Sequence, residues 1–264
     1  MALHFAPDEF ARRQEAARRA MAARGLDGLL LFKQESMYYL TGYDSFGFVF
    51  FQCLHVGADG RMTLLTRSPD LRQAQQTSTL TDIRNWVDAE DADPQASLRA
   101  ILEERGCRGH RLGVEWDSYG LTARNGQRLA EALDGFALLE DASDLVSRLR
   151  LVKSPAEIVY VRRAAVLADG ALEEAVRLAR PGAEEGAILA AMQGAVLAGG
   201  GDYSGNPFIL GSGPGALLCR SYSGRRRLDA RDQLTLEFAG AWRHYHACLM
   251  RTIRIGRREP AEKA

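Results

Sequence analysis

The sequence lacks an excess of charge of either sign. Its 264 residues include 34 basic and 34 acidic side chains, which gives a formal net charge of +0. Proteins that bind nucleic acid need a cationic excess to displace phosphate counterions. The densest basic run, Arg225–Arg227, precedes Leu228 and Asp229 and is typical of a solvated turn. We therefore expect no nucleic-acid partner.

Long apolar runs are missing as well. No window approaches the roughly 20 apolar residues that a helix needs to cross a bilayer. Residues 1–21 carry charged side chains from Asp8 to Arg19, which the apolar core of a signal peptide would not tolerate. We therefore expect no membrane partner and a cytoplasmic location.

Cysteine is scarce and scattered. Cys53, Cys107, Cys219 and Cys248 are far apart in the sequence and form no Cys-x-x-Cys pair. Four cysteines could pair in three ways, but a reduced intracellular chain is the simpler interpretation. The spacing of zinc ligands is also absent, so these residues alone predict no zinc site.

The first part of the chain alternates helix and strand signals. A helix is expected from Pro7 to Gly25, then a buried strand at Leu29–Phe32 and an aromatic-rich connection at Ser36–Tyr43. The remaining expected elements are strands at Phe48–Val56 and Met62–Thr66 around a turn at Asp59-Gly60, a strand at Ile83–Val87, a helix after Pro94, a strand at Leu112–Val114, a helix at Gln127–Leu133 and a strand at Phe136–Leu139. This alternation predicts an α/β domain over residues 1–146.

The second part, residues 147–264, begins with a capping box. Ser154 can cap a helix that has Pro155 at its first position, while Glu157 reaches back to the Ser154 amide. An apolar stripe follows, formed by Ile158, Val161, Ala165, Leu172, Val176 and Leu178. A second helix over 184–197 and strands at Asn206–Leu210, Leu234–Ala239 and Trp242–Ile255 complete an α+β domain.

A glycine-rich stretch, Gly211–Gly215, separates the first two of these strands. It has neither the lysine nor the following helix of a phosphate-binding loop. We expect a turn there, with glycines that permit close backbone approach.

Several segments match a set of motifs in the right order along nearly the whole chain. Met37–Tyr43 looks like N-x-x-Y-L-T-G, and Leu149–Ile158 is similar to R-x-x-K-S-x-x-E-[IL]. Arg180–Gly182 matches R-P-G, Gly211–Arg220 resembles G-x-G-P-N-x-x-x-x-H, and Glu237–Thr252 resembles D-x-G-x-x-x-x-G-Y-x-x-D-x-T-R-T. Together they resemble the creatinase/prolidase family. The resemblance implies a creatinase-type α/β domain followed by a pita-bread catalytic domain, in a family that hydrolyses C–N bonds.

The resemblance also indicates where the family's metal-binding residues would stand, and this chain has other residues at those positions. Metallopeptidase members hold two divalent ions with two aspartates of the last motif, where this sequence has Glu237 and Cys248. Hard cations prefer carboxylate oxygens, and a thiol changes charge, hardness and bite together. We therefore expect no metal and no other cofactor. Manganese, cobalt or zinc would be needed only if the chain were an Xaa-Pro metallopeptidase.

The family's histidine after the Gly-Pro turn is replaced by Arg220, which stays protonated and cannot act as a general base. Arg220 could instead hold a carboxylate or stabilise an oxyanion. His244 and His246 flank Tyr245, and strand alternation would place both histidines on one face. Either could supply the missing base, or simply satisfy hydrogen bonds.

The variant motif is most similar to the metal-independent branch that includes ectoine hydrolase and creatinase. On that basis we predict a C–N hydrolase that acts on a small amidine or amide. Glu237, His246 and Arg220 are its predicted catalytic residues, and the predicted substrate-binding residues are Arg251, Tyr245, His244 and Tyr39. An Xaa-Pro dipeptidase and a non-catalytic remnant or dimerisation subunit are the alternatives.

Length bears on all three possibilities. Family members continue well past the Arg-Thr strand, so we expect residues 147–264 to be a truncated pita-bread domain, through truncation, a frameshift or a separate second chain. The resemblance also implies a homodimer, in which Tyr38, Tyr39 and Tyr43 could line the contact. We expect core packing instead for these tyrosines, because buried aromatic residues usually serve that purpose.

Overall fold

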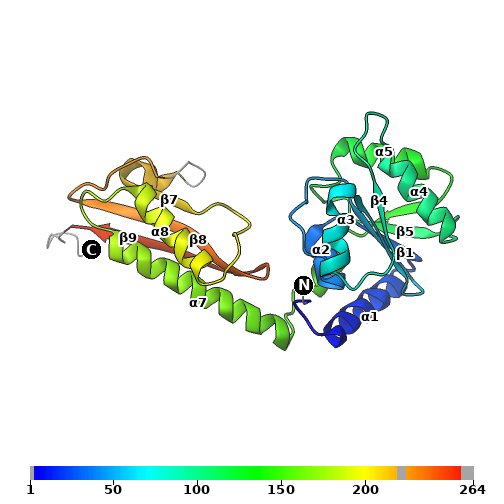
Figure 1. The fold of residues 1–264 in the computed structure, drawn as a ribbon, viewed down its shortest axis with the longest axis horizontal. Helices are drawn as coiled ribbons and strands as arrows, with labels where there is room; N and C mark the ends of the chain where they lie inside the picture. Colours follow the sequence, from blue (N-terminus) through cyan, green and yellow to red (C-terminus); the bar gives the residue numbers. More distant parts are fainter. Residues whose placement is uncertain (1–2, 219–223, 257–264) are drawn as a thin grey trace. The chain divides into compact units, whose positions relative to one another are not determined.

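A computed structural model describes residues 3–218 and 224–256 of the chain. It divides into two compact units, Met1–Val152 and Lys153–Ala264 (Figure 1). None of the helices in the described part of the chain combines the length and hydropathy that a bilayer crossing requires.

The first unit is built on a mixed sheet with strand order β4-β3-β2-β1-β5-β6. Its strands are β1 (Gly28–Leu31), β2 (Cys53–Gly57), β3 (Met62–Arg67), β4 (Ile83–Trp86), β5 (Arg111–Val114) and β6 (Leu138–Asp141). Strand β2 runs antiparallel to β1 and β3, whereas β5 runs parallel to β1 and β6. This confirms the α/β class predicted for the first part of the chain.

Helices cover both faces of this sheet and enclose two apolar cores. They are α1 (Pro7–Ala23), α2 (Gln34–Thr41), α3 (Leu71–Thr77), α4 (Pro94–Glu104), α5 (Ala123–Leu133) and α6 (Leu145–Leu149), with a 3-10 turn, η1, at Ser68–Asp70. Leu29 and Leu31 face one core with residues of α1, α2, α3 and α6, while Leu30 and Leu112 face the other with residues of α4 and α5. Strand alternation sends neighbouring leucines of β1 to opposite cores.

One expectation for this unit needs correction and another is confirmed. The aromatic-rich connection at Ser36–Tyr43 is largely helical, because α2 spans Gln34–Thr41 and ends on Gly42 with a φ of 82°. Tyr38, Tyr39 and Tyr43 are all buried in the unit, which confirms core packing and leaves no exposed contact surface made of these three residues. Its exposed aromatic side chains are instead Phe46, Phe48, Phe50 and Tyr119.

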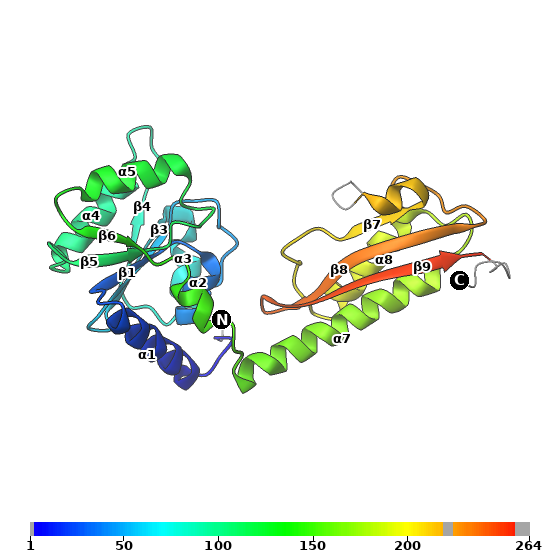
Figure 2. The ribbon, with the colours of Figure 1, turned by 180° about the vertical axis from the view of Figure 1, so that it is seen from behind.

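The second unit packs two helices on one face of a three-stranded antiparallel sheet. The strands, in the order β7-β8-β9, are β7 (Ile209–Ser212), β8 (Asp232–Trp242) and β9 (Tyr245–Ile255). The helices are α7 (Pro155–Leu178) and α8 (Glu185–Ala198), and a second 3-10 turn, η2, spans Gly213–Leu217. Figure 2 shows this sheet from the side opposite α8.

The capping box that begins α7 is present as predicted. The Ser154 hydroxyl accepts a hydrogen bond from the Glu157 amide, and the Glu157 carboxylate accepts one from the Ser154 amide at 2.8 Å. The predicted apolar stripe is only partly right: Leu172 and Leu178 pack against the core, whereas Val176 is 58% exposed and Ile158 36%. The buried face of α7 consists mainly of alanines together with Leu167.

Candidate functional site

One face of the β7–β8–β9 sheet carries most of the motif residues. Strand pairing sets Glu237 opposite Met250, Ala239 opposite Cys248 and Thr235 opposite Thr252. Directly paired residues of antiparallel strands share a face. We call the face that carries Thr235, Glu237, Cys248, Met250 and Thr252 the open face. The other face packs its leucines and phenylalanine (Leu234, Leu236 and Phe238) against α7 and α8.

Glu237 is the only acidic side chain of β8 and β9 on the open face. It is half-buried and has no hydrogen bond or ion pair to another residue of the described ranges 3–218 and 224–256. Met250 stands directly across from it and is 61% exposed, and Cys248 lies diagonally across and is also exposed. Glu237 is thus a carboxylate available for proton transfer in a partly apolar setting.

These residues do not fit a pair of divalent metal ions. The two motif positions supply one carboxylate and one thiol to the open face, whereas hard cations need several oxygen ligands. Nowhere in the described part of the chain do three or more His, Cys, Asp or Glu side chains gather in a way that could hold a metal ion.

The glycine-rich stretch folds over one edge of the open face. Gly211 pairs with Thr235, so its missing side chain would point to the open face. A Cβ atom there would lie 2.5 Å from the Gly215 carbonyl oxygen, which means that η2 rests directly on Gly211. The predicted turn between strands is therefore a 3-10 turn, and Gly211 permits its close approach.

His246 lies on the open face opposite Ala241, but both of its ring nitrogens are engaged. Its Nε2 accepts a hydrogen bond from the Gly205 amide at 2.9 Å, and its Nδ1 lies 2.9 Å from the His244 carbonyl oxygen. A carbonyl only accepts, so Nδ1 is the donor in this contact. His246 could act as a base only after giving up the Gly205 contact.

The structure separates the remaining predicted residues from Glu237. His244 is not on a strand: it occupies the two-residue turn between β8 and β9, with a φ of 68°, so the expectation that it shares a face with His246 was wrong. Tyr245 and Arg251 alternate with His246 and project to the helix side of the sheet. The Tyr245 hydroxyl donates to Glu157 on α7 at 2.8 Å, and Arg251 donates to the Met250 carbonyl.

Two predicted site residues lie elsewhere. Arg220 falls outside the described residues. Tyr39 is buried in the first unit, where the Arg13 guanidinium lies 4.5 Å from the centre of its ring. Tyr39 therefore serves core packing, the second of the roles open to it.

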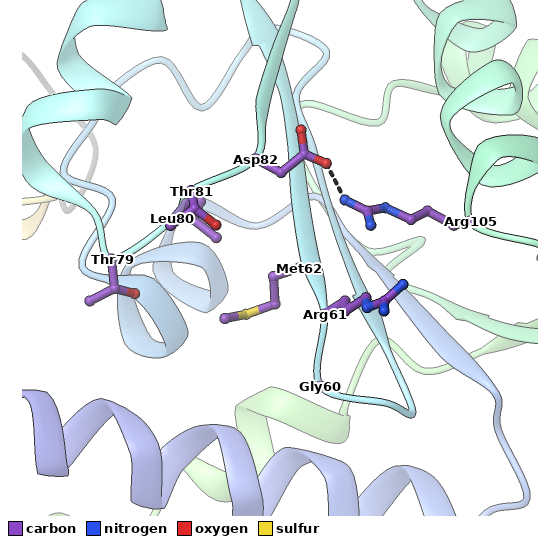
Figure 3. A pocket seen from close by; sticks show the side chains of 8 residues that line it. All are labelled: Gly60, Arg61, Met62, Thr79, Leu80, Thr81, Asp82 and Arg105. Atoms are coloured by element: carbon purple, nitrogen blue, oxygen red, sulfur yellow. Dashed lines mark hydrogen bonds and ion pairs between the residues drawn. The ribbon is translucent and has the colours of Figure 1, made fainter.

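A cavity of about 350 Å³ lies in the first unit and contains none of the predicted site residues. Figure 3 shows Met62 and Leu80 at its apolar side and the ion pair between Asp82 and Arg105 at its polar side. Asp82 compensates the charge of Arg105, which also donates to the Thr63 hydroxyl at 3.0 Å.

The buried carboxylate of Glu185 was missed by sequence reasoning. It stands at the first position of α8 and accepts hydrogen bonds from both ends of the segment that contains η2. An acidic residue in the first turn of a helix is common, because it complements the helix dipole. Its donors, Ser212, Gly224 and Arg226, are distant along the chain, so only the folded structure reveals them.

Comparison with known proteins agrees with this arrangement. Residues 13–152 match the Creatinase/Prolidase N-terminal domain, and residues 159–264 match Metallopeptidase family M24. The chain is 31% identical to an uncharacterised hydrolase/peptidase of Sinorhizobium fredii and 29% identical to the ectoine hydrolase of Halomonas elongata. Both alignments cover 97% of this chain and 68% of the relative.

Solved structures show the same fold. A dipeptidase from Mycobacterium ulcerans superposes with a TM-score of 0.79 at 26% identity, over 97% of this chain and 67% of that one. A prolidase from Thermococcus sibiricus gives a TM-score of 0.83 at 18% identity, over 98% of this chain and 69% of that one. The chain therefore belongs to the creatinase/prolidase family, with a creatinase-type N-terminal domain followed by a domain of the pita-bread M24 type.

Proposed function

We propose that this chain performs the metal-independent C–N bond hydrolysis of the ectoine hydrolase type, on a small cyclic or linear amidine or amide. The observation that carries the proposal is the replacement of both metal-binding aspartates on the open face by Glu237 and Cys248. The 29% identity to an ectoine hydrolase over 97% of this chain supports the same substrate class.

Glu237 is the proposed acid/base group. Its carboxylate would take a proton from water as the water oxygen attacks the amidine or amide carbon, and would return that proton to the departing nitrogen. The C–N bond breaks as the new C–O bond forms, so neither an oxidant nor a reductant is involved. Glu237 is favoured over His246 because the imidazole nitrogens already have partners. Arg220 remains the proposed partner of a substrate carboxylate, because Arg251 lies on the helix side.

Replacement of Glu237 by glutamine tests this role. Proton transfer by a positioned side chain contributes about 10²- to 10⁴-fold to rate. We expect Glu237→Gln to lower kcat on ectoine by that factor while the protein stays folded. Cys248→Ser is the matched control on the same face, and should leave kcat within about threefold. Unchanged turnover in Glu237→Gln would remove Glu237 from the mechanism, and a loss confined to Cys248→Ser would point to thiol chemistry instead.

The metal requirement is tested separately. We expect hydrolysis of ectoine to be the same before and after dialysis against a chelator, because Cys248 places a thiol where a metal pair needs an oxygen ligand. Hydrolysis of the dipeptide glycyl-proline that depends on added manganese would instead support the Xaa-Pro peptidase alternative. Inactivity on both substrates, with a cooperative unfolding transition, would support a non-catalytic protein.

A further inference from the structure

The buried carboxylate of Glu185 links the start of α8 to the two segments that flank η2, which lie far from it in sequence. Its Oε1 accepts hydrogen bonds from the Ser212 amide at 2.9 Å and from the Ser212 hydroxyl at 2.6 Å. Its Oε2 accepts hydrogen bonds from the amides of Gly224 and Arg226, each at 3.3 Å. One carboxylate therefore receives four donors from residues on both sides of η2.

Ser212 connects the Glu185 carboxylate to η2 on the open face. It ends β7 on the helix side, is fully buried, and directly precedes η2. Its hydroxyl also accepts a hydrogen bond from Arg226 Nη1 at 2.6 Å, and the same guanidinium pairs with Asp232 at the start of β8. The direction of the chain as it leaves β7 is thus fixed from the side of the sheet opposite Glu237.

The anchored turn stands next to Glu237. Strand pairing sets Ile209 opposite Glu237 and Gly211 opposite Thr235, so Gly211 is one same-face step along β7 from the residue that pairs with Glu237. Such a step is about 7 Å along a strand. Because η2 rests on Gly211, the position of η2 determines how much space is left beside Glu237 on the open face.

We infer that Glu185 is a positioning residue, which holds η2 against the sheet and so shapes the substrate site beside Glu237. The inference rests on the proposed function for its substrate, but the anchoring itself does not. A carboxylate suits the role because it is an acceptor at both oxygens. A glutamine of the same shape would turn an NH₂ group toward one pair of donors and lose those hydrogen bonds.

Amide hydrogen exchange in the full chain tests the anchoring without any need for turnover. In Glu185→Gln we expect exchange at Ser212, Gly224 or Arg226 to accelerate about tenfold or more, since a hydrogen bond to a charged group is lost. Glu184→Gln is the matched control, because Glu184 is the preceding residue, is exposed and pairs only with Arg227 among the described residues. Unchanged exchange in a folded Glu185→Gln protein would overturn the inference.

Kinetics on ectoine test the effect on the site. We expect Glu185→Gln to raise KM about tenfold or more with a smaller change in kcat, whereas Glu184→Gln should change neither. Accelerated exchange with an unchanged KM would overturn the positioning role. If the wild-type chain does not turn over ectoine, the proposed function fails, and the exchange measurement still decides whether Glu185 anchors η2. Ser212→Ala, which keeps the amide, provides a milder variant should Glu185→Gln not fold.

Discussion

Replacement of Gly240 by alanine is expected to lower the free energy of unfolding of the second unit by about 3 kcal/mol or more. Gly240 lies on the helix side of β8, where α7 crosses the strand. A Cβ atom there would lie 2.5 Å from the Ala168 nitrogen and closer still to the Ala164 carbonyl oxygen. Both neighbours are backbone atoms of a helix, so no side-chain rotation relieves the overlap, and α7 would have to move off the sheet.

A second glycine provides the control. Gly170 lies within α7, and apart from its neighbours in the helix backbone no atom lies within 4 Å of the position that a Cβ atom would occupy. Gly170→Ala should therefore raise stability by about 0.5–1 kcal/mol, through helix propensity alone. Differential scanning calorimetry of the full chain would measure both variants. A loss below 1 kcal/mol in Gly240→Ala would show that α7 approaches β8 less closely than the structure has it.

The same close approach explains why part of the stripe on α7 is wrong. Helical periodicity favours large apolar residues, which here include Ile158, Val161 and Val176. The helix instead buries Ala164, Ala168, Ala171 and Ala175, because small side chains let its backbone approach the sheet at Gly240. Sequence alone shows neither which strand meets the helix nor how near it lies.

Two local signals, by contrast, located their elements correctly. The capping box at Ser154 and the Asp59-Gly60 turn depend on neighbours in sequence, and both are present as predicted. The turn at Arg243 and His244 escaped prediction because neither residue is a glycine or asparagine, although both have positive φ. Because this turn interrupts the strand, the alternation of side chains does not continue through it. The sheet face of each predicted site residue therefore follows only from the pairing of β8 with β9.

The open face shows the same division between motif and geometry. The motif identified Glu237 and Cys248 as positions of interest, and the pairing of β8 with β9 brings them together. The motif alone could not show that Arg251 and Tyr245 project to the helix side of the sheet. Nor could it show that Glu185 supports η2 from that side. Those relations depend on contacts between residues distant in sequence.

Replacement of Glu115 by glutamine is expected to change how the stability of the first unit depends on pH, by about 3 kcal/mol between pH 4.5 and 7. Glu115 follows β5 and is fully buried. It accepts hydrogen bonds from the amides of Phe32 and Lys33, each at 3.0 Å, and from the Ser36 hydroxyl at 2.6 Å. Burial raises the pKa of its carboxyl from 4.5 to about 7, despite these donors and the charge of Lys33.

The sign follows from proton binding. Between pH 4.5 and 7 the folded unit holds a proton on Glu115 that the unfolded chain has released, so this group's contribution to stability is lost as pH rises through 7. Glutamine does not titrate, and it keeps the hydrogen bonds, because its carbonyl oxygen accepts the two amides while its NH₂ group donates to Ser36. The variant should therefore lose this dependence and gain stability relative to wild type at pH 8.

The wild type alone cannot reveal the effect of Glu115, because His55 changes stability with pH in the opposite direction over almost the same pH range. Burial lowers the pKa of the His55 imidazole from 6.5 to about 4, so its contribution to stability is lost as pH falls from 6.5 to 4. In the wild type the two dependences largely cancel, and stability between pH 4.5 and 7 should be nearly flat. In Glu115→Gln only the His55 dependence remains, so stability should rise with pH across this range.

Denaturant unfolding of the full chain at several pH values would measure this, with Glu131→Gln as the control because Glu131 is exposed on α5. The control should follow the wild type. Parallel pH profiles for Glu115→Gln and the wild type would mean that Glu115 is ionised in the folded unit at pH 5, and that its three hydrogen-bond donors outweigh the effect of burial.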